Sequence, residues 1–124
     1  MGRFSELSDC ELVTMKCIWD ADAPISAHEI IRKLKKNYGL DYKDSTVYTF
    51  IKKLKEKGFA NSYRKGVTFY FPVREESEYR SHQLNMTRDF WFKGSTMGLI
   101  SELFRLKPPT QEERDSLKQL LERV

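Results

Sequence analysis

The sequence predicts a mainly α-helical protein with one small β-hairpin. Hydrophobic residues recur at helical spacing in three segments before residue 57 and in three more after residue 74. Between these groups the spacing changes to alternation around a glycine, which is the pattern of a hairpin. The chain has 124 residues, of which 40% are hydrophobic and 32% charged, a composition typical of globular domains.

The first predicted helix begins after Ser8. Ser8 and Glu11 have the capping-box spacing, in which a side-chain acceptor precedes a glutamate by three residues. Residues at helical spacing follow, and we expect them to face a core: Leu12, Met15, Ile18 and Trp19. The helix should end near Asp20, and Pro24 and Ile25 should form a short extended link.

Two further helices are predicted before the hairpin. Ser26 and Glu29 form a second capping-box pattern, and Asn37 to Gly39 end that helix. Asp44 is the expected cap of the third helix, and Gly58 its stop. The residues expected to face inward from these two helices are Ala27, Ile30, Ile31, Leu34, Val47, Phe50, Ile51 and Leu54.

The hairpin follows directly. Val67, Phe69 and Phe71 alternate with polar or amphipathic neighbours, so we expect Phe69 and Phe71 to reach the core. Arg64-Lys65-Gly66 is the expected tip, and Pro72 ends the second strand. An exposed aromatic platform for single-stranded nucleic acid, formed by Tyr63, Phe69, Tyr70 and Phe71, is the alternative. Three helices followed by a hairpin is the order of the winged helix-turn-helix.

The C-terminal part is predicted to contain three amphipathic helices, over residues 75–93, 96–106 and 110–124. They are too short to enclose a sizeable core, so their apolar faces need the first domain or a second copy of the chain. We therefore expect a winged-helix domain over residues 1–73 and a helical dimerisation domain over residues 74–124. The expected interface residues are Tyr79, Met86, Phe90, Leu99, Leu103, Leu117 and Leu120.

Positive charge is concentrated in one segment. The chain carries 22 basic and 18 acidic side chains, a net charge of +4. Residues 32–65 hold 11 basic and 3 acidic side chains, a local charge of +8, whereas residues 74–124 hold 9 of each. This distribution favours a polyanion as the partner of the first part, with a solvated lysine surface as the alternative.

The third helix suits a DNA groove on the face opposite its apolar side. At 100° per residue, Ser45, Thr49 and Lys52 point outward. Thr46 and Lys53 flank one edge of this face, and Tyr48 flanks the other. Hydroxyl groups can serve base edges or phosphates, and lysines mainly serve phosphates. Arg64 and Lys65 at the wing are placed to reach a phosphate or the minor groove.

Several stretches resemble the penicillinase-repressor (BlaI/MecI/CopY) family of bacterial winged-helix regulators. They are "LSDCELVTMKCIWD", "ISAHEIIRKL", "STVYTFIKKLKEKGF", "YFP" and "FKGSTMGLISEL". The resemblance implies a homodimer that binds a palindromic operator in double-stranded DNA and represses transcription. It assigns Ser45, Thr46, Tyr48, Thr49 and Lys52 to the operator-reading helix, and Arg64 and Lys65 to the wing. The alternative is a winged-helix protein-interaction module, whose third helix would show exposed apolar anchors.

The sequence departs from the family at its induction sites. Members that respond to β-lactams are cut at an Asn-Phe bond, which aligns with Glu102-Leu103 here, while Phe104 lies one position later. A membrane sensor-protease is therefore not supported as a partner, although a protease of different specificity stays open. The copper-responsive branch uses a C-terminal Cys-x-Cys pair, and no cysteine follows Cys17.

Other chemistries find little support. Cys10 and Cys17 are about 10 Å apart on one helix, too far for a disulfide, and Cys17 is expected to be buried. His28 and His82 lack partners at metal-ligand spacing, so we expect no metal site and no cofactor. No catalytic constellation is recognisable, which predicts a protein that is not an enzyme. Free thiols and the lack of an apolar run of about 20 residues predict a cytoplasmic protein without membrane insertion.

Overall fold

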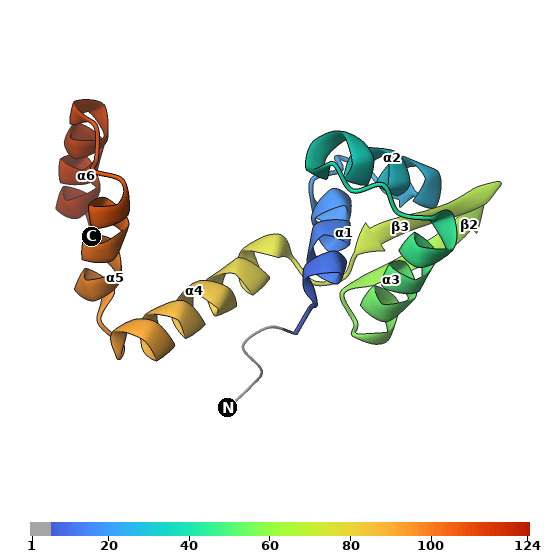
Figure 1. Ribbon diagram of the computed structural model, residues 1–124, viewed down its shortest axis with the longest axis horizontal. Coiled ribbons are helices and arrows are strands. Elements are labelled where there is room, and N and C mark those ends of the chain that lie inside the picture. The colour runs from blue at the N-terminus through green and yellow to red at the C-terminus, as the bar shows by residue number, and fades with distance from the viewer. Residues whose placement is uncertain (1–5) are drawn as a thin grey trace. The chain divides into compact units, whose positions relative to one another are not determined.

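The structure is a computed structural model that describes residues 6–124 (Figure 1). Its contacts divide the chain into two compact units, one ending at Gln83 and the other spanning Leu84–Val124. The division falls inside a helix, α4 (Glu76–Phe92), rather than after residue 73. Assignment of DNA binding and dimerisation to residues 1–73 and 74–124 stays a prediction.

Helix α1 (Asp9–Trp19) begins with the predicted capping box. The Glu11 N–H donates to Ser8 Oγ at 3.2 Å, and the Ser8 N–H donates to Glu11 Oε1 at 3.1 Å. Helix α2 (Ala27–Tyr38) has only half of its expected box, because Ser26 Oγ accepts from the Glu29 N–H at 3.2 Å while the Glu29 carboxylate binds Arg32 instead.

Helix α3 (Asp44–Glu56) differs from expectation at its start and agrees at its end. The N-cap is Lys43, whose side chain makes no capping hydrogen bond, so the prediction that Asp44 is the cap was wrong. Asp44 lies one residue later, where its charge favours the positive end of the helix dipole. Gly58 adopts φ +79°, and the Phe59 N–H donates to Leu54 O at 2.9 Å, which closes a Schellman motif with the predicted glycine.

The sheet contains three antiparallel strands in the order β1-β3-β2. The strands are β1 (Ile25–Ser26), β2 (Ala60–Lys65) and β3 (Val67–Pro72). The segment expected as an extended link is thus a third strand, with Ile25 opposite Tyr70. Arg64 and Lys65 pair with Thr68 and Val67 inside the ladder, so Gly66 alone separates β2 from β3, at φ +76°.

The two faces of β3 are the reverse of the expectation. Tyr70 is buried, with 7% of its surface exposed, whereas Phe69 and Phe71 are only half-buried. Both rings lie beside Tyr63, with centroids 5.7 and 6.1 Å from its ring. The physical reason is the register: Ala60 enters the core directly after Phe59, and its alternate residue Ser62 pairs with Tyr70, which therefore shares the inner face.

The hydrophobic core lies entirely in the first unit. Among the described residues the buried apolar side chains are Leu7, Met15, Cys17, Ile18, Ile25, Ala27, Ile30, Leu34, Val47, Ile51, Leu54, Phe59, Ala60, Tyr70 and Tyr79. Trp19 is partly buried and holds the start of α4, because its indole N–H donates to Arg74 O at 2.8 Å. Its ring also lies 5.8 Å from that of Tyr79 and 6.4 Å from that of Phe59.

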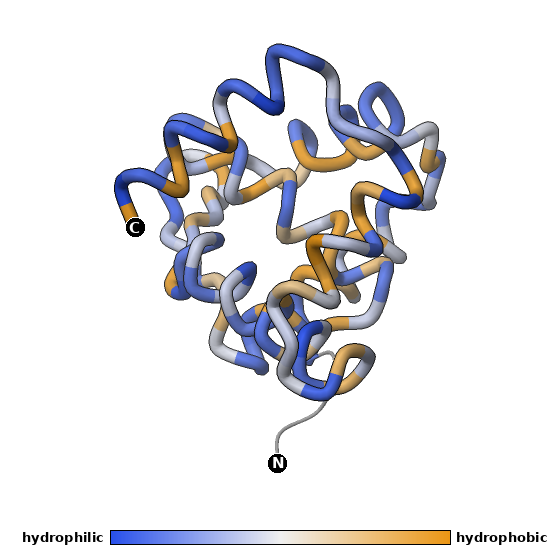
Figure 2. The backbone as a smooth tube through the Cα atoms, turned by 90° about the vertical axis from the view of Figure 1, so that its left-hand side faces the viewer, coloured by the Kyte–Doolittle hydropathy of each residue, from blue (hydrophilic) through white to orange (hydrophobic). Residues whose placement is uncertain are grey.

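The second unit comprises the end of α4 together with α5 (Thr96–Leu106) and α6 (Gln111–Arg123). Lys93 (φ +52°) and Gly94 (φ +82°) end α4, Ser95 caps α5, and Thr110 and Glu113 form the predicted capping box of α6. Hydrophobic positions alternate with hydrophilic ones along this part of the chain (Figure 2). No residue from Leu84 to Val124 is buried, although the structure describes all of them.

Candidate nucleic-acid interface

Helix α3 is fixed on one side and exposed on the other. Val47, Ile51 and Leu54 are at most 2% exposed, so they anchor the helix in the core. Phe50, expected with them, is only half-buried and packs edge-on against the ring of Tyr42 at 5.2 Å. The predicted outward residues are placed as expected: Ser45, Tyr48, Thr49, Lys52 and Lys53 are exposed, and Thr46 is half-buried.

The hydroxyl group of Thr49 is already partly used by the helix itself. Its Oγ1 donates to the backbone oxygen of Ser45 at 3.0 Å, one turn earlier. The donor is therefore occupied, while the exposed side chain still has Oγ1 lone pairs and a methyl group. Such a side chain can accept a hydrogen bond from a base amino group or pack against a thymine methyl group.

The lysines of α3 differ in the hydrogen bonds and ion pairs that their ammonium groups make. Lys52 makes no ion pair with any other described residue, and Lys53 lies 3.9 Å from Glu56, a loose surface pair. Lys55, which the sequence did not single out, donates to Ser62 Oγ at 2.9 Å and so connects α3 to strand β2. Exposed pairs at these distances contribute little energy, and a phosphate can therefore replace the carboxylate of Glu56.

Tyr48 stands between two hollows beside the wing. Its side chain is 53% exposed. One hollow, of about 320 Å³, lies between Tyr48, the start of α2 and the wing, and Arg64 lines it. The other, of about 400 Å³, continues from Tyr48 along Lys52 and Lys55. The structure thus places Arg64 in the same hollow as Tyr48 of α3.

Lys65 is not part of this arrangement. It pairs with Val67 and, by strand alternation, lies on the opposite face of the hairpin from Arg64. Sequence reasoning also missed His28 and Thr68, which line the hollow with Arg64. The one sequence signal for His28 is its position in the first turn of α2, directly after the cap Ser26. No sequence signal indicates Thr68.

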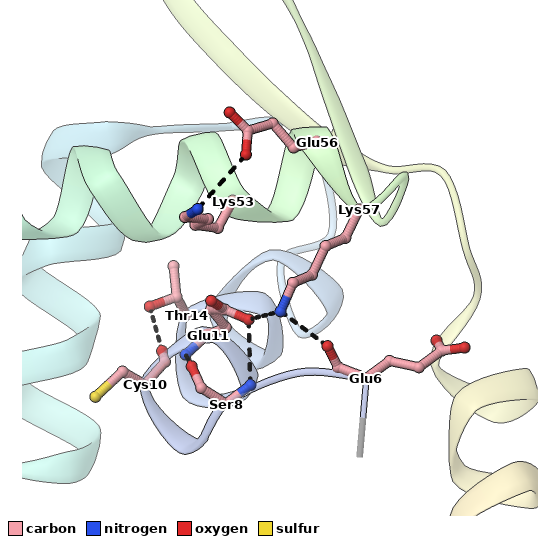
Figure 3. Close-up of polar contacts among 8 residues, drawn as sticks. All are labelled: Glu6, Ser8, Cys10, Glu11, Thr14, Lys53, Glu56 and Lys57. Carbon is pink, nitrogen blue, oxygen red and sulfur yellow. Dashed lines mark hydrogen bonds and ion pairs between the residues drawn. The ribbon is translucent and has the colours of Figure 1, made fainter. Parts of the chain in front are cut away.

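The end of α3 is attached to α1 by a buried carboxylate (Figure 3). Lys57 Nζ donates to Glu11 Oε1 at 2.5 Å and to Glu6 O at 2.9 Å. Burial alone would raise the pKa of Glu11, but the hydrogen bonds from Lys57 and Ser8 outweigh it, and the pKa is lowered. Glu11 therefore stays charged, and its ion pair with Lys57 connects the C-terminal end of α3 to α1.

The hairpin contains basic but no acidic side chains. Residues 57–74 include Lys57, Arg64, Lys65 and Arg74 and contain no Asp or Glu. Lys57 and Arg74 are paired with Glu11 and Glu6, so Arg64 and Lys65 are the basic side chains that the wing itself presents. Beside it, the α3 surface presents hydroxyls and lysines. An exposed basic surface on a helix and an adjoining wing is the arrangement with which winged helix-turn-helix proteins contact a DNA duplex.

Other candidate chemistries stay unsupported in the described part of the chain. No group of three or more His, Cys, Asp or Glu residues there could hold a metal ion. Burial raises the pKa of the Cys17 thiol to about 11, so this thiol is unreactive at neutral pH. None of the described helices is long and apolar enough to cross a membrane.

The fold and this surface define a DNA-binding protein of the winged helix-turn-helix class. The chain belongs to the penicillinase repressor family, whose model matches residues 7–123. Members of the family are DNA-binding transcriptional repressors, so the alternative of a protein-interaction module is not supported.

One relative matches nearly the whole chain, and two solved structures match about two thirds of it. The penicillinase repressor of Bacillus licheniformis is 28% identical over 123 residues, which cover 98% of this chain and 94% of that protein. The solution structure of the monomeric form of Bacillus licheniformis BlaI with the blaP half-operator is similar with a TM-score of 0.50 and 34% identity. The solution structure of the BlaI DNA-binding domain gives a TM-score of 0.51 and 34% identity. Each match covers 64% of this chain and 94% of the other.

Proposed function

We propose that the protein is a homodimeric repressor that recognises a palindromic operator by placing α3 in the major groove of each half-site. The observation that carries the proposal is the outward face of α3, where Ser45, Thr49 and Lys52 are exposed while three buried residues fix the helix. The major groove is about as wide as one α-helix, so this face can meet base edges. The complex of the relative with the blaP half-operator supports operator DNA as the partner.

The residues divide into base readers and phosphate binders. We assign base contacts to Ser45, Tyr48 and Thr49, with Thr49 acting through its lone pairs or its methyl group. We assign phosphate contacts to Thr46, Lys52, Lys53, Arg64 and Lys65. Arg64, which lines the same hollow as Tyr48, would contact a phosphate there. Lys65 would contact the DNA backbone from the other face of the wing.

Dimerisation is assigned to the second unit. Large apolar side chains there are exposed: Phe90 (56%), Leu103 (54%) and Leu120 (48%). Met86, Leu99 and Leu117 are half-buried and can add to the same interface. Tyr79, which the sequence predicted for this interface, does not belong to it. Tyr79 is 3% exposed and packs on Trp19 in the first unit.

A pair of winged-helix units would bind DNA more strongly at cellular salt than a single unit. Roughly 8 phosphate contacts per dimer give a slope of log K against log salt near −7, at about −0.9 per contact. A single unit makes half as many contacts. The equal numbers of basic and acidic side chains in residues 74–124, 9 of each, also suit a segment that pairs with a copy of itself.

The proposal does not include cleavage by a membrane sensor-protease. The bond Glu102-Leu103 lies inside α5, and its residues match neither member of the Asn-Phe pair. Glu102 is instead paired with Arg105, whose Nε donates to Glu102 Oε2 at 3.0 Å. The inducing signal and the operator sequence are separate questions.

A gel shift on the promoter of the protein's own gene, at two salt concentrations, tests the proposal. We expect Lys53→Ala to weaken specific and random duplexes alike, and Tyr48→Ala or Thr49→Ala to reduce preference for the operator by about 1–3 kcal/mol. Lys118→Ala, on the exposed surface of α6, is the matched control. Equal losses on specific and random duplex for all three α3 variants would contradict base reading, and a sedimentation pattern of monomers at micromolar concentration would contradict the dimer.

A further inference from the structure

The hollow between the start of α2, the wing and α3 contains a side chain that the proposed DNA contacts leave unassigned. His28 is exposed and lines this hollow of about 320 Å³ together with Arg64, Thr68 and Tyr48. It lies in the first turn of α2, two residues after Ser26, where β1 pairs with β3. The pairing of these two strands therefore fixes His28 beside the wing.

The hollow has basic but no acidic side chains. None of the described residues that line it carries a carboxylate, and its two basic side chains are His28 and Arg64. The neighbouring carboxylate on α2, that of Glu29, is engaged by Arg32, whose Nη2 donates to Glu29 Oε2 at 2.8 Å. The other polar side chains around the hollow are hydroxyls, on Ser26, Tyr48, Thr68 and Tyr70. Basic groups and hydroxyls together suit an anion, and a phosphate is the anion that a DNA duplex would bring there.

We propose that His28 is a further phosphate-binding residue, which contacts the DNA backbone beside Arg64 when its imidazole ring is protonated. This inference rests on the proposed function and adds a proton-linked contact to it. Imidazole normally changes its charge between about pH 5 and pH 8, and only the protonated ring donates from both nitrogens. Because a phosphate beside the ring favours the protonated form, DNA binding takes up a proton and affinity rises as the pH falls.

The pH dependence of DNA affinity tests the proposal with the full-length chain. Fluorescence anisotropy is measured with a duplex from the promoter of the protein's own gene and with a random duplex, at constant ionic strength. We expect affinity for both duplexes to rise roughly tenfold from about pH 7.5 to about pH 5.5, because each chain gains one phosphate contact. At the lower pH, the slope of log K against log salt should become steeper by about 0.9 per chain.

Three variants separate His28 from other titrating groups. His28→Gln keeps a hydrogen-bonding side chain but cannot become charged, so the rise at low pH should disappear. His28→Lys is charged throughout, so it should bind at about pH 7.5 as tightly as the unchanged protein binds at about pH 5.5. The chain has 2 histidines, and the second lies in α4 outside the hollow. His82→Gln is therefore the matched control and should keep the full pH dependence.

The outcomes distinguish this contact from the repressor function on which it rests. A rise that persists in His28→Gln, or no rise in the unchanged protein, would overturn the His28 contact and leave the proposed repressor intact. A rise confined to the promoter duplex would contradict a phosphate contact, because phosphates are present in every sequence. No binding of the unchanged protein to either duplex at low salt would refute the proposed function itself, and this inference with it.

Discussion

The two units of this chain reach their structure in different ways. The first encloses every buried apolar side chain of the described residues, from Leu7 to Tyr79. The second has three capped helical segments and not one buried residue between Leu84 and Val124. Local signals are equally good in both, since Ser8 and Thr110 head the same complete capping box. Capping and periodicity therefore specify helices, whereas stability requires a core, which in our proposal the second unit obtains by dimerisation.

Removing one phenylalanine from each unit tests this contrast most strongly. Phe59 is 1% exposed and Phe90 is 56% exposed. We expect Phe59→Ala to lower the free energy of unfolding of the first unit by about 3–5 kcal/mol, because it leaves a cavity beneath Arg74 and Tyr79. Phe90→Ala should leave that transition unchanged in urea denaturation. Similar losses for both variants would contradict the division.

Charge placed on the apolar face of the second unit should separate the proposed dimer. Leu103→Glu and Leu120→Glu each introduce a carboxylate at an exposed leucine, and burial of an unpaired charge in an interface is strongly unfavourable. We expect sedimentation equilibrium to show monomers and the helical signal of the second unit to be lower than in the unchanged protein at the same concentration. Lys118→Glu, on the same helix as Leu120, is the control. A dimer that survives both leucine variants would place the interface elsewhere.

The indole N–H of Trp19 donates one hydrogen bond to the backbone of Arg74, just before α4, beside the ion pair of Lys16 with Glu76 and the packing of Tyr79. Trp19→Phe keeps a ring against Phe59 and Tyr79 but leaves the Arg74 carbonyl without its donor at 2.8 Å. We expect a loss of about 1–3 kcal/mol in the unfolding of the first unit. Amide hydrogen exchange at the start of α4 should rise in parallel. Unchanged exchange there would show that the ion pair and ring packing suffice to hold the helix.

The two capping boxes allow a matched comparison of one motif in both units. Ser8→Ala should cost about 1 kcal/mol in the cooperative unfolding of the first unit. Thr110→Ala removes the same bond from α6, and its effect should depend on protein concentration if α6 belongs to the proposed dimer interface. Thermal melts at two concentrations measure both. A concentration-independent cost for Thr110→Ala would indicate that α6 is stable without a partner.

The smallest expected effect is a pH dependence from Glu11. Burial acts to raise its pKa, but Lys57 and Ser8 lower it below the unfolded value, so the carboxylate stabilises the fold above about pH 4.3. This contribution should be lost as pH falls through the lower folded pKa. The free energy of unfolding should fall between about pH 6 and pH 3. We expect Glu11→Gln to reduce this fall by less than about 1 kcal/mol, measured by urea denaturation. An unchanged acid profile would contradict the role of the Lys57 contact.

Sequence alone predicted the helices, the wing and the outward face of α3 because each depends on neighbours along the chain. Gly58 illustrates this, since a positive φ in a Schellman motif is a local requirement. The strand phase could not be predicted in this way. Whether Tyr70 or Phe69 faces inward is decided by Ala60 and by pairing with Ile25, both distant in sequence. The proposed interface of the second unit could not be predicted residue by residue, because periodicity identifies the apolar face of a helix but not the surface that covers it.

Ser26 belongs to two elements at once. It is the last residue of β1, opposite Phe69, and its hydroxyl caps α2. A shift of the wing base would therefore pull on the first turn of the supporting helix, whereas the far end around Gly66 has no such tether to a helix. Bending should be confined to the last few residues of the hairpin, so the wing can adapt to variable groove width while its root sets a constant distance from α3.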